Sequence, residues 1–243
     1  MENRTYDHYF GARSMIEGLP GDGLLPGMSN LDKAGVARSV YRETVFCVPD
    51  PPHGWDGSHE QFGTTGMNDG FMREYQDSHG DDIPPYVMGY FQREDLPVSW
   101  ALGDAYTLCD RWFSSVMGPT WPNRFYLPTA QSGGRMSNEI PPSILPTIYD
   151  RLNEAGIEWM YYYSDLPFIA LLSQTQNLPI EFFYEDAKNG TLPPVTFLDP
   201  SFGLNDDHPP HHPLMGQQFI SSIYQALATS PHWNNCLLVV TYD

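Results

Sequence analysis

The residues best suited to chemistry lie in one short stretch, 117–124, which reads M-G-P-T-W-P-N-R. It places a hydroxyl (Thr120), an amide (Asn123) and a guanidinium (Arg124) within five residues. Glycine and proline on both sides of the threonine break regular structure. A hydroxyl on a rigid turn just past a strand is where an α/β enzyme places a nucleophile. The same residues also fit an ordinary turn with a capping threonine, so the neighbouring segments must decide.

Oxygen donors and imidazoles occur in three further segments. Glu2 and Asn3 are adjacent hard donors that suit a divalent cation, although a charged chain end would look the same. His53 lies in the rigid loop D-P-P-H-G-W and could ligate a metal, contact phosphate or simply be solvated. Residues 205–213, N-D-D-H-P-P-H-H-P, hold two Asp and three His among three prolines. That composition suits a metal or general-acid site, or else an acidic surface loop.

Apolar patterns predict the elements that position these residues. We expect strands over 45–48, 107–116, 157–163, 195–198 and 237–243, and helices over 58–75, 92–105, 141–155 and 215–229. The continuous apolar run at 237–243 is typical of a buried parallel strand. Helices alternating with strands predict a parallel sheet with crossover helices.

Four candidate groups fall at predicted strand ends. Thr120, Asp199 and Asp243 each follow an expected strand, and Glu2 would do so if a strand preceded it. Ligands of open α/β sheets bind at the carboxyl ends of the strands. The sequence therefore predicts one shared site.

Charge and composition limit the classes of function. The chain has 243 residues, enough for one large α/β domain or two small ones, and 41% of them are hydrophobic. Its net charge of −18 argues against binding nucleic acid through phosphate contacts. Chemistry on a phosphate ester would need a local cation to offset this field, which favours a metal.

Targeting signals are absent from the sequence, and its cysteines form no metal motif. No apolar run reaches membrane-spanning length, and no signal peptide is present. Cys47, Cys109 and Cys236 form no C-x-x-C pair, so we expect small buried residues, with one pair across the core possible. The chain opens directly in M-E-N-R-T-Y-D-H-Y-F-G and closes on an apolar strand pattern, which predicts a fragment truncated at both ends.

Five stretches, in order along the whole chain, resemble a bacterial phosphoesterase family. They read E-N-R-T-Y-D-H-Y-F-G, D-P-P-H-G-W, C-D-R-W-F-S-S-V-M-G-P-T-W-P-N-R-F-Y, D-D-H-P-P and V-V-T-Y-D. The family includes non-zinc phospholipases C and an acid phosphatase, within the alkaline-phosphatase-like superfamily. The resemblance implies a single phosphoesterase catalytic domain over 1–243. It also implies a mainly parallel sheet sandwiched by helices, with long irregular insertions.

The resemblance assigns roles to residues at matching positions. It implies one divalent metal ion, of unknown identity, held by Glu2, Asn3, Thr120 and Asp243. Thr120 would be the nucleophile. The implied substrate contacts are Asn123 (to a phosphoryl oxygen), Arg124 and Asp207. The implied phosphoryl or proton-transfer histidines are His53 and His208.

Two departures from the family pattern affect metal binding. The apolar strand that usually precedes E-N-R is absent, as are the Glu and His-Gly-Gly segment that usually follow T-Y-D. A further acidic ligand is therefore missing, and we expect weak metal binding and low activity from this chain.

The function implied is metal-dependent hydrolysis of a phosphate ester or phospholipid through a phosphothreonine intermediate. The G-P-T-x-P-N-R form favours a phospholipase C-like enzyme. The alternatives are an acid phosphomonoesterase of the same family and a catalytically incompetent remnant that binds phosphate or metal. The many aromatic rings could hold a choline-like head group or simply form the core. Family habit implies a periplasmic or secreted protein, and the sequence does not determine the oligomeric state.

Overall fold

The computed structural model describes residues 1–243 and contains α-helices, short 3-10 helices and strands. The α-helices are α1 (Tyr6–Tyr9), α2 (Ala12–Glu17), α3 (Trp55–Phe62), α4 (Phe71–His79), α5 (Pro97–Ala105), α6 (Thr120–Thr129), α7 (Ile148–Glu154), α8 (Ile180–Asn189) and α9 (Pro213–Ala228). The 3-10 helices are η1 (Tyr86–Met88), η2 (Phe168–Leu172) and η3 (Trp233–Asn235). The strands are β1 (Ser29–Leu31), β2 (Ala37–Ser39), β3 (Tyr41–Arg42), β4 (Gly89–Tyr90), β5 (Trp159–Tyr163), β6 (Asn177–Pro179) and β7 (Val195–Asp199).

A three-stranded parallel sheet in the order β6-β5-β7 carries helices on both faces. Trp159 and Tyr161 of β5 pack into an apolar cluster with α6, α7 and η2, while Tyr162 packs on the other face against α8 and α9. This alternation follows from the two-residue period of a strand. The predicted α/β class and helix-covered parallel sheet are confirmed, although the sheet is small.

Two predicted strands are absent because they have no neighbouring strand. Residues 107–116 form no strand, and Trp112 and Phe113 are 68% and 80% exposed. Residues 237–243 are likewise not a strand, and Leu237 is 88% exposed. An apolar run predicts a strand only if another strand is available to pair with its backbone groups. Thr120 therefore does not follow a strand.

Three further predictions, of a helix, a strand and buried cysteines, are wrong. The helix expected over 58–75 is divided into α3 and α4, because α3 ends at Gly63, whose positive φ (74°) glycine adopts at little cost. Residues 45–48 are not a strand, since the Glu43 carboxylate accepts the backbone N–H groups of Thr44 and Val45. All three cysteines are free and exposed rather than buried.

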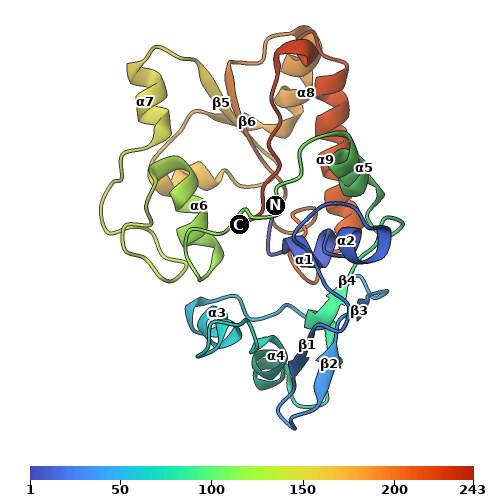
Figure 1. Ribbon diagram of the computed structural model, residues 1–243. Coiled ribbons are helices and arrows are strands. Elements are labelled where there is room, and N and C mark those ends of the chain that lie inside the picture. The colour runs from blue at the N-terminus through green and yellow to red at the C-terminus, as the bar shows by residue number, and fades with distance from the viewer.

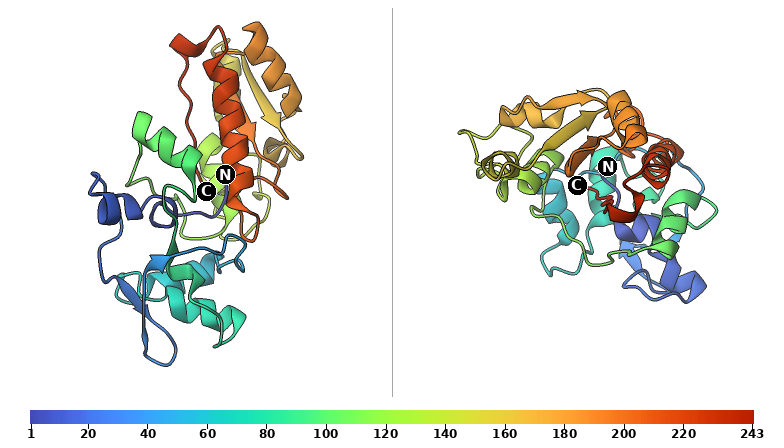
Figure 2. Two further views of the ribbon diagram at one scale, coloured as in Figure 1. Left: turned by 90° about the vertical axis from the view of Figure 1, so that its right-hand side faces the viewer. Right: turned by 90° about the horizontal axis from the view of Figure 1, so that it is seen from above.

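Figure 1 shows the parallel sheet with α6 to α9 in one part of the molecule and α3, α4 and β1 to β4 in another. Both chain termini lie where the two parts meet, and they stay together in the two views of Figure 2. The Met1 ammonium donates to the Thr241 carbonyl oxygen (3.3 Å), and the Asp243 N–H donates to the Met1 carbonyl oxygen (3.2 Å). The first and last acidic side chains are thereby brought to one place. No helix combines the length and apolarity that crossing a membrane requires.

Candidate active site

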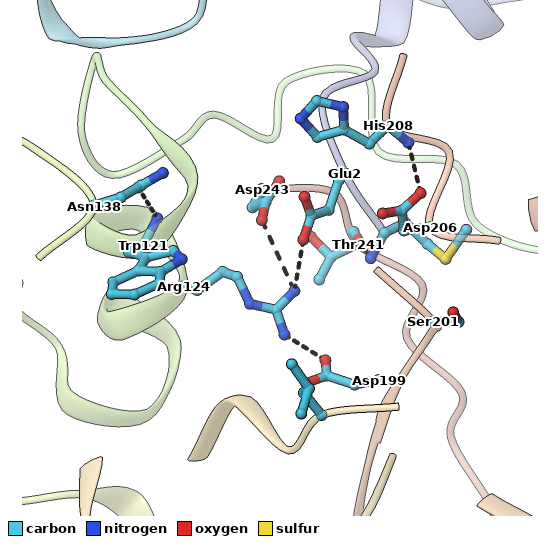
Figure 3. A network of polar contacts seen from close by, with 12 residues as sticks. Glu2, Trp121, Arg124, Asn138, Asp199, Ser201, Asp206, His208, Thr241 and Asp243 are labelled. Atoms are coloured by element: carbon cyan, nitrogen blue, oxygen red, sulfur yellow. Dashed lines mark hydrogen bonds and ion pairs between the residues drawn. The ribbon is translucent and has the colours of Figure 1, made fainter. Parts of the chain in front are cut away.

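Arg124 lies at the centre of three carboxylates from separate parts of the chain (Figure 3). Its Nη1 is 3.6 Å from Glu2 Oε1 and 3.8 Å from Asp243 Oδ2, and its Nη2 donates to Asp199 at the end of β7. The four side chains are at most 12% exposed. Of the predicted strand-end groups, only Asp199 does end a strand, yet Glu2, Asp199 and Asp243 do share one site.

One guanidinium does not neutralise three buried carboxylates. Burial, together with the charge of Asp243, raises the pKa of Glu2 to about 7. Burial also raises the pKa of Asp243. Both carboxylate oxygens of Asp243, and Nδ2 of Asn3, are buried without a hydrogen-bond partner. The unpaired oxygens of Asp243, in an excess of negative charge, fit a divalent cation. The Glu2 carboxylate and the side-chain oxygen of Asn3 are the further donors suited to hold one.

Helix α6 carries Thr120 and Arg124 on one face. Thr120 is the first residue of the helix and half-buried, and Arg124 follows one turn later. Residues at i and i+4 are neighbours on a helix surface, about 6 Å apart along its axis. Thr120 therefore lies one helical turn before Arg124, the residue whose side chain contacts the three carboxylates. The positive end of the helix dipole also lies at Thr120, where it favours an anion.

The side chain of Asn123 is hydrogen-bonded to the backbone of the loop that leads into α6. Its Oδ1 accepts the Val116 N–H (2.8 Å), and its Nδ2 donates to the carbonyl oxygens of Val116, Gly118 and Pro119 at 3.0–3.2 Å. These bonds close the loop that holds Thr120. The amide expected to meet a phosphoryl oxygen thus fixes the backbone before the threonine.

His53 and His208 meet from two loops, with Asp50 between them. The ring centroids are 5.3 Å apart. Asp50 Oδ2 is 3.4 Å from His53 Nδ1 and 4.0 Å from His208 Nε2. The contact with Asp50 raises the pKa of His53. These three groups are close enough to share a metal ion, with all ligand atoms within 4.8 Å.

Asp206 and Asp207 form hydrogen bonds to residues next to the site. Asp207 has no exposed surface, and its carboxylate accepts the Tyr242 hydroxyl (2.8 Å). Asp206 Oδ1 accepts the His208 N–H (3.0 Å) and contacts His211 Nδ1 (2.7 Å). Since the side chain of Asp207 is sealed from solvent, the structure favours a supporting role over the expected contact with substrate.

A cavity of about 400 Å³ adjoins the cluster. Arg124, Asp199 and Asp243 form part of its polar lining. Most of its wall is apolar, including Leu127 and Phe168. A ligand with both an anionic and an apolar part would match this lining.

A small parallel α/β sheet, a threonine at a helix N-terminus and a buried oxygen-donor cluster place the protein among α/β proteins with a site suited to an anionic ligand. The chain belongs to the Phosphoesterase family, whose model matches residues 1–243. The family resemblance of the sequence motifs is thus confirmed.

Similar proteins occur in plants and mycobacteria. The chain is 34% identical to Non-specific phospholipase C1 of Arabidopsis thaliana over 273 residues, covering 100% of this chain and 50% of that protein. It is 31% identical to Non-specific phospholipase C6 of the same plant, with 100% and 51% covered. It is 29% identical to Phospholipase C B of Mycobacterium tuberculosis, with 100% and 56% covered. The chain thus spans about half the length of the curated relatives it matches.

Sequence reasoning missed Asp50 and the central place of Arg124. Asp50 lies within the D-P-P-H segment, three residues before His53, and an acid at that distance in a proline-rich loop was the available signal. The partners of Arg124 come from three segments far apart in sequence, which no local pattern connects.

Proposed function

We propose that this protein hydrolyses phosphate esters in a phospholipase C-like reaction that passes through a phosphothreonine intermediate on Thr120. The observation that supports the proposal is α6, on which Thr120 lies one turn before Arg124, the residue whose guanidinium contacts the Glu2 and Asp243 carboxylates. Membership of the Phosphoesterase family and similarity to proteins named phospholipase C support it.

In the proposed mechanism Thr120 Oγ1 attacks phosphorus in line with the departing alkoxide. The dipole of α6 stabilises charge on the phosphoryl oxygens, and Asn123 keeps the loop before Thr120 in place. Glu2, Asn3, Asp243 and Thr120 would hold a divalent cation, which when bound would lower the pKa of the threonine hydroxyl and neutralise phosphoryl charge. A histidine of the His53–His208 pair protonates the leaving oxygen.

A phosphodiester with apolar chains is the substrate class we favour. The largely apolar cavity beside Arg124 offers room for the apolar part of a phospholipid. An acid phosphomonoesterase would not need a cavity with a largely apolar lining. We also propose, from the family resemblance alone, a periplasmic or secreted location.

A second candidate is a phosphate- or metal-binding protein without turnover. It is favoured by the position of Arg124, whose guanidinium already contacts Glu2 and Asp243. A divalent cation would have to share these carboxylates with a fixed internal cation, which weakens its binding.

The test compares Thr120→Ala with Thr120→Ser on p-nitrophenyl phosphate and p-nitrophenylphosphorylcholine. We expect the alanine variant to lose at least about a thousandfold in kcat, because a lost nucleophile leaves only binding and electrostatics. The serine variant should keep measurable activity. Preference for the choline diester would support the phospholipase C-like reaction over the monoesterase.

Thermal unfolding with added Mg²⁺, Ca²⁺ or Mn²⁺ serves as the control. Thr120→Ala should keep most of the metal-dependent rise in Tm, since three carboxylate or amide ligands remain. Unchanged turnover in Thr120→Ala would remove the threonine from the mechanism. Metal binding without any turnover in the parent protein would favour the second candidate.

A further inference from the structure

Asp50 contacts both candidate proton-transfer histidines with one carboxylate oxygen. Its Oδ2 is 3.4 Å from Nδ1 of His53 and 4.0 Å from Nε2 of His208. The other oxygen, Oδ1, is buried and has no hydrogen-bond partner. A half-buried carboxylate with one unpaired oxygen is costly unless a neighbouring cation compensates it, and a protonated imidazole is the available cation.

The two rings are held differently, and this distinguishes their roles. His53 Nδ1 contacts the Pro51 carbonyl oxygen (2.9 Å) as well as Asp50, which leaves its Nε2 free. His208 Nδ1 contacts the Pro209 carbonyl oxygen (2.6 Å), and its Nε2 faces Asp50. The bond to the Pro51 carbonyl oxygen puts a proton on Nδ1, and a carboxylate beside Nδ1 stabilises the imidazolium, with Nε2 left for the reacting group. His53 is therefore the ring prepared to donate a proton.

The loop that carries Asp50 is anchored from its other side. The buried Tyr75 donates its hydroxyl to the Pro49 carbonyl oxygen (3.0 Å). The Gln61 side-chain amide donates to the carbonyl oxygen of Pro52. With bonds on both sides of the Asp50–Pro51 unit, the carboxylate has little freedom to leave the histidines.

We propose that Asp50 is a positioning residue that orients His53 and holds it as an imidazolium, so that His53 protonates the leaving alkoxide. This inference rests on the proposed function and assigns the acid of that reaction to His53. As the Thr120 oxygen bonds to phosphorus and its proton passes to solvent, the ester P–O bond breaks and its oxygen takes the proton from His53 Nε2. In the second step water returns a proton to His53 as its oxygen bonds to phosphorus. The Thr120–phosphorus bond then breaks, and the threonine oxygen regains a proton from solvent.

The test uses two choline phosphodiesters that differ only in the leaving group. One releases p-nitrophenol, which departs without protonation, and the other releases an alkyl alcohol, which requires a proton. We expect Asp50→Asn to reduce kcat on the alkyl ester by about a hundredfold, within the range typical of general acid catalysis, with KM little changed. On the aryl ester the reduction should stay below about threefold. His53→Gln should show the same difference between the substrates, and Asp50→Glu should recover part of the activity on the alkyl ester.

Two controls separate this inference from the proposed function. Asp56→Asn makes the same charge change at an exposed site on α3 and should leave both reactions unaltered. Thr120→Ala should abolish both reactions equally, whereas loss of the acid affects mainly the alkyl ester. Equal losses on both esters in Asp50→Asn would show a structural role. Recovery of that variant by excess Zn²⁺ would show a metal ligand. Either result overturns the proposal.

A measurement without turnover provides an independent check. The groups facing His53 are Asp50 on its own loop, His208 from the loop after β7, and Asp243 at the C-terminal end. An NMR titration of the His53 ring should show a lower midpoint in Asp50→Asn than in the parent protein and the Asp56→Asn control. An unchanged midpoint would overturn the proposal whatever the activities are.

Discussion

At the scale of single residues, the site is defined by buried carboxylates, and burial disfavours their charged form. Glu2 and Asp243 are buried near each other, and the single Arg124 guanidinium also serves Asp199. Protons or a divalent cation can relieve the remaining repulsion. The protonation of Glu2 should therefore be visible in the stability of the metal-free protein.

The pKa of Glu2 rises from its ordinary 4.5 to about 7 because of burial and the Asp243 charge. Between these values the folded state holds a proton that the unfolded state has lost, so stability falls as the pH rises. The free energy of unfolding should decrease by up to about 1.4 kcal/mol per pH unit across this window. Denaturant unfolding at pH 5, 6 and 7 measures it. Glu2→Gln should remove this part of the fall and the exposed-site control Glu158→Gln should not. An identical pH dependence in all three proteins would contradict the assignment.

At the scale of elements, α6 connects the parts of the site. It presents Thr120, ties down its leading loop through Asn123, and sends Arg124 toward β7 and both chain ends. Arg124 also lies over the Phe168 and Phe202 rings, 4.5 and 4.9 Å from their centroids. The position of the helix thus depends on a buried charge network.

Arg124→Met should destabilise the protein by about 3–5 kcal/mol, because it leaves three buried carboxylates without a cation. Arg151→Met is the matched control, since Arg151 pairs with Glu154 (2.7 Å) on the exposed surface of α7. That variant should lose no more than about 1 kcal/mol. Denaturant unfolding at pH 7.5 compares them. Equal small losses would mean that the carboxylates are protonated or hydrated and that Arg124 does not hold the cluster together.

The elements also show what could be predicted from the sequence. β5, β7 and α9 were predictable because their periodicity coincides with packing on both faces of a real sheet. The strands expected at 107–116 and 237–243 were not, because periodicity reports apolar content and cannot report whether a partner strand exists. The convergence of Glu2, Asp199 and Asp243 was correctly expected, but the arginine at its centre was not.

At the scale of the whole molecule, the site lies where two parts of the structure and both termini meet. Arg124 lies in α6, Asp199 ends β7 and His208 lies just before α9, whereas Asp50 and His53 lie just before α3. A reaction that needs both sets depends on how these parts stay packed. The prediction of a single domain over 1–243 stays a prediction.

The charge of the molecule should govern which lipid surfaces it can use. With 30 acidic and 12 basic residues the net charge is −18, so a negatively charged vesicle repels the protein before any specific contact forms. If the proposed phospholipase C-like activity holds, hydrolysis of phosphatidylglycerol vesicles should be slow at about 10 mM salt and rise several-fold by about 150 mM. Over that range the Debye length falls from about 30 to about 8 Å. Phosphatidylcholine vesicles should show less than about a twofold change, because a zwitterionic surface exerts little long-range force.

The soluble ester p-nitrophenylphosphorylcholine separates steering from chemistry in the same salt series. Its rate should stay nearly constant, since a small zwitterionic substrate feels little of the net charge. The ratio of vesicle to soluble rates then isolates the surface effect. Faster hydrolysis of anionic vesicles at low salt would contradict the prediction. It would mean that some of the basic residues form a local positive surface, and that its attraction to the vesicle exceeds the repulsion caused by the net charge.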